Sequence, residues 1–357
     1  MDKLPEEMVY DILQRCPAKA VERCLDAFPA FTALVRSPSF STDFCLRSLP
    51  TQQDRVLFAT TNENMLQETR TWIFNSSSTA EQEEESTLLL STTTLPLHDH
   101  RQNKYMNYSA GLLCSGSGKN PIIYNPTNGE HRVLPGVIFG QKEVDVVRCF
   151  LGFSRVSGFN VIAVVKDACQ MLSLDTMAWM PIKCNHLPSP ETASVSIEGS
   201  IYYAAYETPP RTMVLIIFNI ETELFRIVKI PQAPMCGLLL CEKIMNVDGK
   251  VGICFVVRGG KREVKILENS DEELWSTRTI ESPRFPMNDV QHFPLLSFEG
   301  FTRHGETIFS QDVSSSKALY YCDLDNESYR KEVHVLLDRQ SSQTLTFWQH
   351  VDSTMFM

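Results

Sequence analysis

The sequence predicts a small all-α unit at the N-terminus followed by a large all-β domain. Apolar residues recur with helical spacing in the first fifty residues. From Tyr105 onward, short β-type runs are bounded by Gly, Pro, Asn and Asp. Hairpin-like segments in the β region also recur at intervals of about 50 residues, the repeat length of four-stranded propeller blades. A β-propeller is therefore favoured, and a pair of β-sandwiches is the competing fold.

Composition excludes several classes of protein. The 357 residues are 43% apolar and 21% charged, which is ordinary for a soluble globular chain. A net charge of -10 argues against a nucleic-acid binder, because such proteins need a basic face. No run of eighteen apolar residues and no signal peptide is visible, so no membrane association is expected. Eleven cysteines without a Cys-x-x-Cys pair favour reduced thiols in a cytoplasmic or nuclear protein.

The first unit, residues 1–50, is expected to contain three short helices. An apolar stripe with a spacing of four residues marks the first helix, formed by Leu4, Met8, Ile12 and Cys16. Pro17 ends this helix, a second is predicted over 18–27 and a third over 29–36, and the segment Ser-Pro-Ser-Phe closes the unit. Fifty residues bury little apolar surface by themselves, so part of the stripe is expected to bind a partner.

Residues 51–104 are expected to connect the two parts. They combine strand-like runs with a Ser/Thr-rich loop that carries the acidic residues 81–85. The β domain is assigned to 105–350, with a start of its first blade near residue 55 as the alternative boundary.

Five hairpins carry the repeat within the β domain. Their equivalent second-strand positions are predicted to be Arg132, Trp179, Phe225, Trp275 and Tyr329. A single hairpin cannot bury its own apolar face, and radial stacking of several sheets supplies the core in a propeller. The aromatic members of this set are therefore expected to pack between strands.

The N-terminal segment LPEEMVYDILQRCPAK resembles an F-box. The family pattern is Leu-Pro-x-x-Leu, then Ile-Leu, then Leu-Pro-Ala-Lys. The matching positions here are Leu4, Pro5, Met8, Ile12, Leu13, Cys16, Pro17, Ala18 and Lys19. Further along, the segments GLLCSGSGKNPIIYNPTNGEHRVLP, FLGFSRVSGFNVIAVV and IIFNIETELFRIVKIP resemble successive motifs of the plant F-box-associated domain (type 1/3).

This resemblance implies a non-catalytic subunit of an SCF-type ubiquitin ligase. The helices would bind a Skp-type adaptor and through it a cullin, and a propeller-like β domain would bind a protein substrate. No cofactor and no nucleic acid is implied. The positions implied to bind the adaptor are Leu4, Pro5, Met8, Ile12, Leu13, Cys16, Pro17, Phe31, Leu34 and Val35.

The chain departs from the family pattern at Ala27, Pro29 and Phe31, where the family has Val, Lys and Trp. Phe31 keeps an aromatic side chain, while Pro29 would break a continuous helix but is tolerated at the start of a new one. Two interpretations therefore stay open. The chain has an F-box that binds the adaptor, or it is a β-propeller protein-binding module whose degenerate F-box no longer engages the ligase.

Enzymatic motifs are weak in this sequence. The His98–His100 pair lacks further metal ligands nearby, and CSGSGK, ending at Lys119, lacks the spacing of a phosphate-binding loop. No Gly-x-Ser-x-Gly motif is present. We therefore expect no catalytic residue and no metal site.

Overall fold

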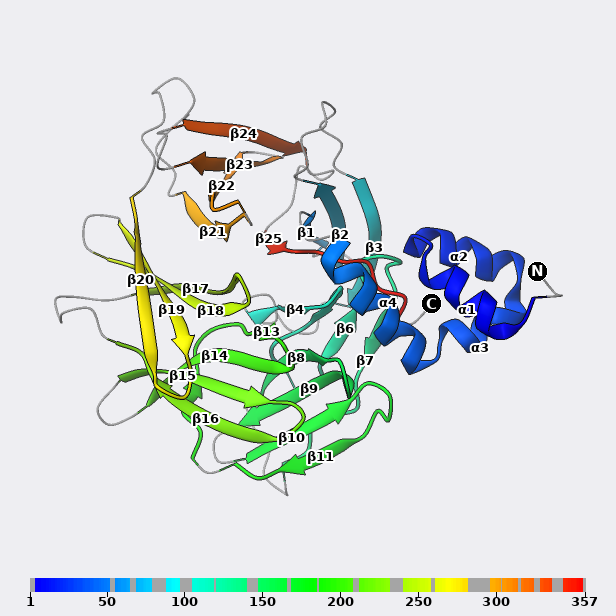
Figure 1. Ribbon diagram of the computed structural model, residues 1–357, viewed down its shortest axis with the longest axis horizontal. Helices are drawn as coiled ribbons and strands as arrows, with labels where there is room; N and C mark the ends of the chain where they lie inside the picture. Colours follow the sequence, from blue (N-terminus) through cyan, green and yellow to red (C-terminus); the bar gives the residue numbers. More distant parts are fainter. Residues whose placement is uncertain are drawn as a thin grey trace.

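Figure 1 shows the computed structural model of the chain. The residues described are 4–51, 55–64, 69–78, 88–96, 105–118, 120–139, 147–165, 168–184, 186–207, 212–231, 240–257, 261–281, 296–302, 304–313, 316–323, 328–335 and 343–355. The helices lie together at one edge, and the strands form radially arranged sheets beside them (Figure 1).

The helical unit begins as the sequence predicts. It consists of α1 (Glu6–Gln14), α2 (Ala18–Ala27), the 3-10 helix η1 (Pro29–Phe31), α3 (Thr32–Val35) and α4 (Pro38–Thr51). The chain leaves the helical conformation at Phe28, whose φ is -136° and ψ is 75°, and Pro29 then opens the next turn. Pro29 thus lies at a junction between helices, where its missing N–H is tolerated.

The structure differs from the prediction at Ser-Pro-Ser-Phe. This segment does not close the unit but starts α4, the longest helix described. Pro38 occupies the first helical position, where its fixed φ is favourable. The Ser37 Oγ accepts a hydrogen bond from the Phe40 N–H at 3.3 Å, as an N-cap residue does. A Ser-Pro pair is thus a helix start as well as a helix stop.

Replacing Ser37 by Ala should lower the free energy of unfolding by about 1 kcal/mol, because α4 loses this cap. Chemical denaturation followed by circular dichroism measures the change. Ser37→Thr keeps a capping oxygen and should stay within about 0.5 kcal/mol of the wild type. Equal losses in both variants would contradict this role of the hydroxyl.

The helices share one apolar core. Its fully buried members are Val9, Leu13, Ala18, Val21, Val35, Phe40 and Phe44. The ring of Tyr10 meets Phe40 edge-on at 5.2 Å between centroids. This core takes residues from each of the four α-helices, so α4 belongs to the unit.

In the part of the chain described, the strands fall into six four-stranded antiparallel groups. The second and fourth of these groups are joined into one nine-stranded sheet by a parallel contact between Tyr108 and Val195. The first group is β25 (Gln343–Trp348), β1 (Arg55–Asn64), β2 (Thr69–Ser78) and β3 (Leu88–Pro96). The second is β4 (Asn107–Ser109), β5 (Leu112–Cys114), β6 (Ile122–Tyr124) and β7 (His131–Val133). The third is β8 (Arg148–Ser154), β9 (Gly158–Val165), β10 (Ala168–Ser173) and β11 (Trp179–Ile182).

The remaining groups repeat this arrangement. The fourth is β13 (Val195–Ile197), β14 (Ser200–Glu207), β15 (Thr212–Asn219) and β16 (Leu224–Lys229), with β12 (Ser189–Pro190) beside β14. The fifth is β17 (Leu240–Val247), β18 (Lys250–Val256), β19 (Arg262–Asn269) and β20 (Leu274–Ile280). The sixth is β21 (Ser297–Phe301), β22 (Thr307–Val313), β23 (Ser316–Asp323) and β24 (Ser328–Val335). The prediction of a β-propeller is confirmed.

The register of the repeat is visible in the pairs that join the third and fourth strands of five groups. These pairs are Tyr124 with His131, Leu172 with Trp179, Phe218 with Phe225, Leu267 with Trp275, and Cys322 with Tyr329. Four of the five predicted positions are therefore equivalent. In the second group the equivalent residue is His131, not Arg132, because the turn places the left-handed Gly129 two residues before it.

The ring of sheets is closed by the end of the chain. β25 pairs antiparallel with β1, so the last strand completes the group that the first strands begin. Strands therefore start at Arg55, inside the region expected to be a connection. The acidic residues 81–85 and the histidines 98 and 100 lie outside the described residues. None of the described helices has the length and apolar character needed to cross a membrane.

Asn107 ties three groups together near the inner strands. Its Nδ2 donates to the carbonyl oxygens of Tyr105 at 2.9 Å and Cys149 at 2.7 Å. Its Oδ1 accepts from the Ser194 N–H at 2.7 Å and the Ser194 hydroxyl at 3.0 Å. One buried amide thus satisfies backbone groups from the second, third and fourth groups, which fixes their relative positions.

Candidate functional site

The exposed apolar surface of the helical unit lies on and just before α1. Leu4, Met8 and Ile12 are 40%, 52% and 38% exposed. The opposite side of α1 is buried, with Val9 and Leu13 only 1% exposed each. A helix that already buries one apolar face and exposes another has a surface suited to a partner. We call Leu4, Met8 and Ile12 the α1 stripe.

The other predicted adaptor-binding residues divide into two sets. Pro5 and Pro17 are exposed and precede α1 and α2, while Cys16, Phe31 and Leu34 are half-buried. These five can be reached from outside the unit.

Two predicted contact residues lie inside the unit. Leu13 and Val35 are 1% and 0% exposed, within the core shared by the helices. The sequence pattern did not separate them from the α1 stripe, because both kinds of position are apolar. The structure places their side chains where they support the surface from beneath.

Polar contacts hold α1 against α4. The Tyr10 hydroxyl donates to the Asp43 carboxylate at 2.6 Å, and the Gln14 Nε2 donates to the Phe40 carbonyl at 2.8 Å. Burial and the carboxylate of Asp43 raise the pKa of Tyr10 to about 12, so its hydroxyl stays protonated and remains a donor. The orientation of the α1 stripe relative to α4 is therefore fixed by specific bonds.

α4 in turn packs on the propeller. Cys45 is fully buried in a core shared with the second and third groups, and its Sγ–H donates to the Ala110 carbonyl at 3.5 Å. Ala110 and Gly111 form the turn between β4 and β5. A side chain at Gly111 would meet the Val351 carbonyl at 2.7 Å, so the turn, the helix and the C-terminal segment fit closely.

The segment after β25 completes this junction (Figure 1). The Tyr108 hydroxyl accepts hydrogen bonds from Val351 N–H at 3.0 Å and Gly111 N–H at 3.1 Å. The Asn125 Nδ2 donates to the carbonyls of Ser353 and Met355 at 3.0 and 2.7 Å. Residues 349–355 are thus bonded into the second group, beside α4.

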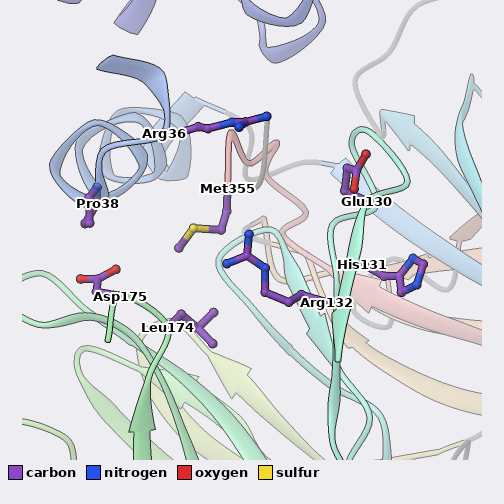
Figure 2. A pocket seen from close by; sticks show the side chains of 8 residues that line it. All are labelled: Arg36, Pro38, Glu130, His131, Arg132, Leu174, Asp175 and Met355. Carbon is purple, nitrogen blue, oxygen red and sulfur yellow. The ribbon is translucent and has the colours of Figure 1, made fainter. Parts of the chain in front are cut away.

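A cleft of about 450 Å³ lies next to this junction, between the helices and the propeller (Figure 2). Its lining residues are Arg36, Pro38, Glu130, His131, Arg132, Leu174, Asp175 and Met355. Figure 2 shows the Met355 side chain between the helices and Arg132. Burial raises the pKa of Asp175. The described residues that line the cleft carry both signs of charge and include no serine or cysteine.

The chemistry of the described residues offers little for catalysis. They contain no group of three or more His, Cys, Asp or Glu residues that could hold a metal ion. Every cysteine in the described ranges is a free thiol. Burial raises the pKa of both Cys45 and Cys149 to about 12, which keeps these thiols protonated and unreactive at neutral pH.

The propeller and the segment beside α4 match the sequence profile of a known family. The sequence profile described as "F-box associated beta propeller domain" matches residues 55–351, from the first strand of the first group to the segment beside α4. The chain belongs to this family. Its helical unit stands where the resemblance to an F-box was found.

Relatives among curated proteins support the same assignment across the helices as well. The chain is 23% identical to F-box protein At1g30790 of Arabidopsis thaliana, over 93% of this chain and 89% of the relative. It is 22% identical to At1g47790 of the same plant, named as a candidate F-box protein, over 94% and 86%. Both alignments are longer than the propeller and therefore also include residues of the helical unit. The family is thus that of plant F-box proteins with an F-box associated domain.

Among solved structures, the chain is similar to the crystal structure of TolB from Acinetobacter baumannii. The TM-score is 0.47 at 11% identity, and the match covers 82% of this chain and 66% of that one.

No local sequence pattern predicts the junction formed by α4 and the C-terminal segment. Its residues are distant in sequence, such as Cys45 with Ala110 and Asn125 with Ser353.

Proposed function

We propose that this chain is the substrate-recognition subunit of an SCF-type ubiquitin ligase, in which the helical unit binds a Skp-type adaptor and the propeller binds a protein substrate. The observation that carries the proposal is the α1 stripe, which stays exposed on the helical unit of a chain whose propeller belongs to the F-box associated family. The adaptor would connect the chain to a cullin.

The α1 stripe supplies the apolar contact in this proposal. Burying Leu4, Met8 and Ile12 against the adaptor would remove their apolar surface from water. This would stabilise the complex by about 25 cal/mol for each Å² buried. Pro5, Cys16, Pro17, Phe31 and Leu34, which stay accessible on the same helical unit, form the rest of the contact surface. Leu13 and Val35 act from the core by holding the helices in place, not by touching the adaptor.

The junction gives the helical unit a second role. α4 shares one core with α1 and another with the propeller. Arg55 of β1 pairs with Asp352 at 2.9 Å, and both side chains are largely buried. A substrate held on the propeller would therefore keep a defined position relative to the adaptor. Ubiquitin transfer itself would be carried out by other subunits of the ligase, so this chain needs no nucleophile.

Direct binding tests the proposal. Purified full-length chain is mixed with a purified plant Skp-type adaptor, and complex formation is followed by size-exclusion chromatography and calorimetry. A stable one-to-one complex supports the proposal. Absence of a complex, where a well-behaved F-box protein forms one under the same conditions, would favour the degenerate F-box. In that case Pro29→Lys combined with Phe31→Trp should restore binding.

A further inference from the structure

The sequence CSGSG, residues 114–118, has a structural role beyond a hairpin turn. After β5 the chain runs antiparallel to the start of β8: Cys149 N–H donates to the Gly116 carbonyl at 3.1 Å, and Gly118 N–H donates to the Val147 carbonyl at 3.3 Å. Ser117 and Arg148 are bridge partners in this pairing. Paired residues in an antiparallel bridge direct their side chains to the same side.

Glycine is required at one point of this pairing. A Cβ at Gly116 would lie 1.5 Å from the carbonyl oxygen of Tyr105, which no side chain can tolerate. The segment therefore packs directly on the backbone that precedes β4. Tyr105 is brought beside Arg148, and the guanidinium carbon lies 3.6 Å from the centroid of its ring. Ser117, Tyr105 and Arg148 are thus held together by backbone contacts.

Two polar atoms of this cluster, one on Arg148 and one on Ser117, lack protein partners. The Nε of Arg148 and the Oγ of Ser117 are both buried without a hydrogen bond. Among the described residues, no carboxylate forms an ion pair with Arg148. A guanidinium without an acid is unusual in a chain of net charge -10. Arginine is also the side chain best suited to bind carboxylate or phosphate oxygens through two parallel hydrogen bonds.

The cluster lies on the side of the propeller away from the helices. β8 starts at Arg148 and ends at Ser154, and the turn that follows it leads to Gly158 at the start of β9, where a Cβ would lie beside Thr42 of α4. In the same way, β4 and β5 meet at the Ala110 turn, against Cys45. Arg148 and the helix-facing turn are therefore separated by the length of a strand, roughly 20 Å.

We propose that Arg148 and Ser117 form a recognition site for an anionic side chain of a protein substrate, either a carboxylate or a phosphate. The stack on Tyr105 holds the guanidinium plane in place, which lowers the entropy lost on binding. The Ser117 hydroxyl supplies a second donor. This inference rests on the proposed function, because it assigns the substrate contact of the same subunit.

A peptide library tests the site. Pools of nine-residue peptides with a fixed central Glu, phosphoserine, Gln or Ser are passed over immobilised full-length chain, and the retained peptide is quantified. The wild type should retain the Glu or phosphoserine pool about tenfold better than the neutral pools, since a charge-assisted hydrogen bond is stronger than a neutral one. The pool that is preferred distinguishes carboxylate from phosphate.

Variants assign the preference to the site. Arg148→Ala should abolish it, Arg148→Lys should keep part of it, and Ser117→Ala should weaken it several-fold. The matched control is Arg155→Ala, an exposed arginine directly after the other end of β8, which should retain the full preference. Equal retention of all four pools by the wild type overturns the proposal. So does an undiminished preference in folded Arg148→Ala, which would leave Arg148 with only a packing role on Tyr105.

The same variants separate this proposal from the ligase role. Arg148→Ala should bind the Skp-type adaptor as the wild type does, because the α1 stripe is untouched. If the wild type shows the anion preference but no adaptor binding, the ligase role fails and the site stands. If the wild type binds the adaptor but shows no anion preference, the anion site fails and the ligase role stands. Should Arg148→Ala fail to fold, Arg148→Lys and Ser117→Ala decide the outcome alone.

Discussion

Replacing Met8 and Ile12 together by Asp should abolish binding of a Skp-type adaptor while the chain stays folded. Both side chains are exposed in the free chain, at 52% and 38%, so the two carboxylates remain in water and the helical core is unchanged. In the proposed complex they would be buried without a partner. An uncompensated buried charge costs about 3–5 kcal/mol, which predicts a loss of at least a hundredfold in affinity.

The propeller offers a matched control for this variant. Leu224 and Leu274 open the outer strands β16 and β20 and are 67% and 54% exposed. Replacing both by Asp introduces the same charge at leucines that are more exposed than Met8 and Ile12, and adaptor affinity should stay within about twofold. Calorimetric titration measures both variants, and circular dichroism verifies their folding. Equal affinity of the Met8/Ile12 variant and the wild type would place the contact surface elsewhere.

The second large effect is expected at Glu299, where charges are buried between the fifth and sixth groups. Its side chain is 7% exposed, the Nζ of Lys243 lies 2.6 Å from its Oε2, and the Nζ of Lys317 lies 3.5 Å from its Oε1. The Ser310 hydroxyl donates to it at 2.6 Å. Glu299→Gln removes the charge and leaves Lys317, 6% exposed, without its buried counter-ion. The free energy of unfolding should fall by about 3 kcal/mol.

The loss of stability in Glu299→Gln should depend on pH in a defined direction. Burial would raise the pKa of Glu299, but Lys243 and Lys317 outweigh it and lower the pKa to about 2 from 4.5. A group with a lowered pKa in the folded state adds stability above its unfolded value, and this contribution disappears as the pH falls toward the folded value. The difference between the wild type and Glu299→Gln should therefore be full at pH 6 and shrink between about pH 4.5 and 2.

Denaturant unfolding across this pH range checks the prediction. Glu281→Gln is the control, because Glu281 forms an ion pair with Lys261 in which the side chains are 69% and 51% exposed. Exposed pairs contribute about 1 kcal/mol or less, so this variant should unfold close to the wild type at every pH. A constant difference for Glu299→Gln from pH 6 to pH 2 would show that its carboxylate is not stabilised by the lysines.

Local patterns predicted most of the architecture. The four-residue spacing from Leu4 to Cys16 predicted α1, and the hairpins around Trp179, Phe225 and Trp275 predicted the repeat. These signals survive because each depends on neighbouring residues. The predicted position Arg132 is one residue away from the equivalent position, His131, because the left-handed conformation of Gly129 sets where the last strand of this group begins. The pair Ser37-Pro38 can start a helix, as it does for α4, but a Ser-Pro pair is equally typical of the end of a helix.

The candidate sites were predictable only in part. The family pattern named the residues of the α1 stripe, yet burial alone distinguishes Ile12 from Leu13. The pairing of Ser117 with Arg148 depends on chain segments from two groups of the propeller. Contacts of this kind have no local sequence signature, because they form only when the sheets close into a ring.

The central claim is that the α1 stripe couples whatever the propeller holds to a ubiquitin ligase. Affinity purification of the full-length chain from plant cells, followed by mass spectrometry, compares the wild type with the Met8→Asp/Ile12→Asp variant. The account predicts a Skp-type adaptor and a cullin with the wild type, their loss with the variant, and equal recovery of the remaining bound proteins. Recovery of adaptor and cullin in equal amounts with both chains, or with neither, would contradict it.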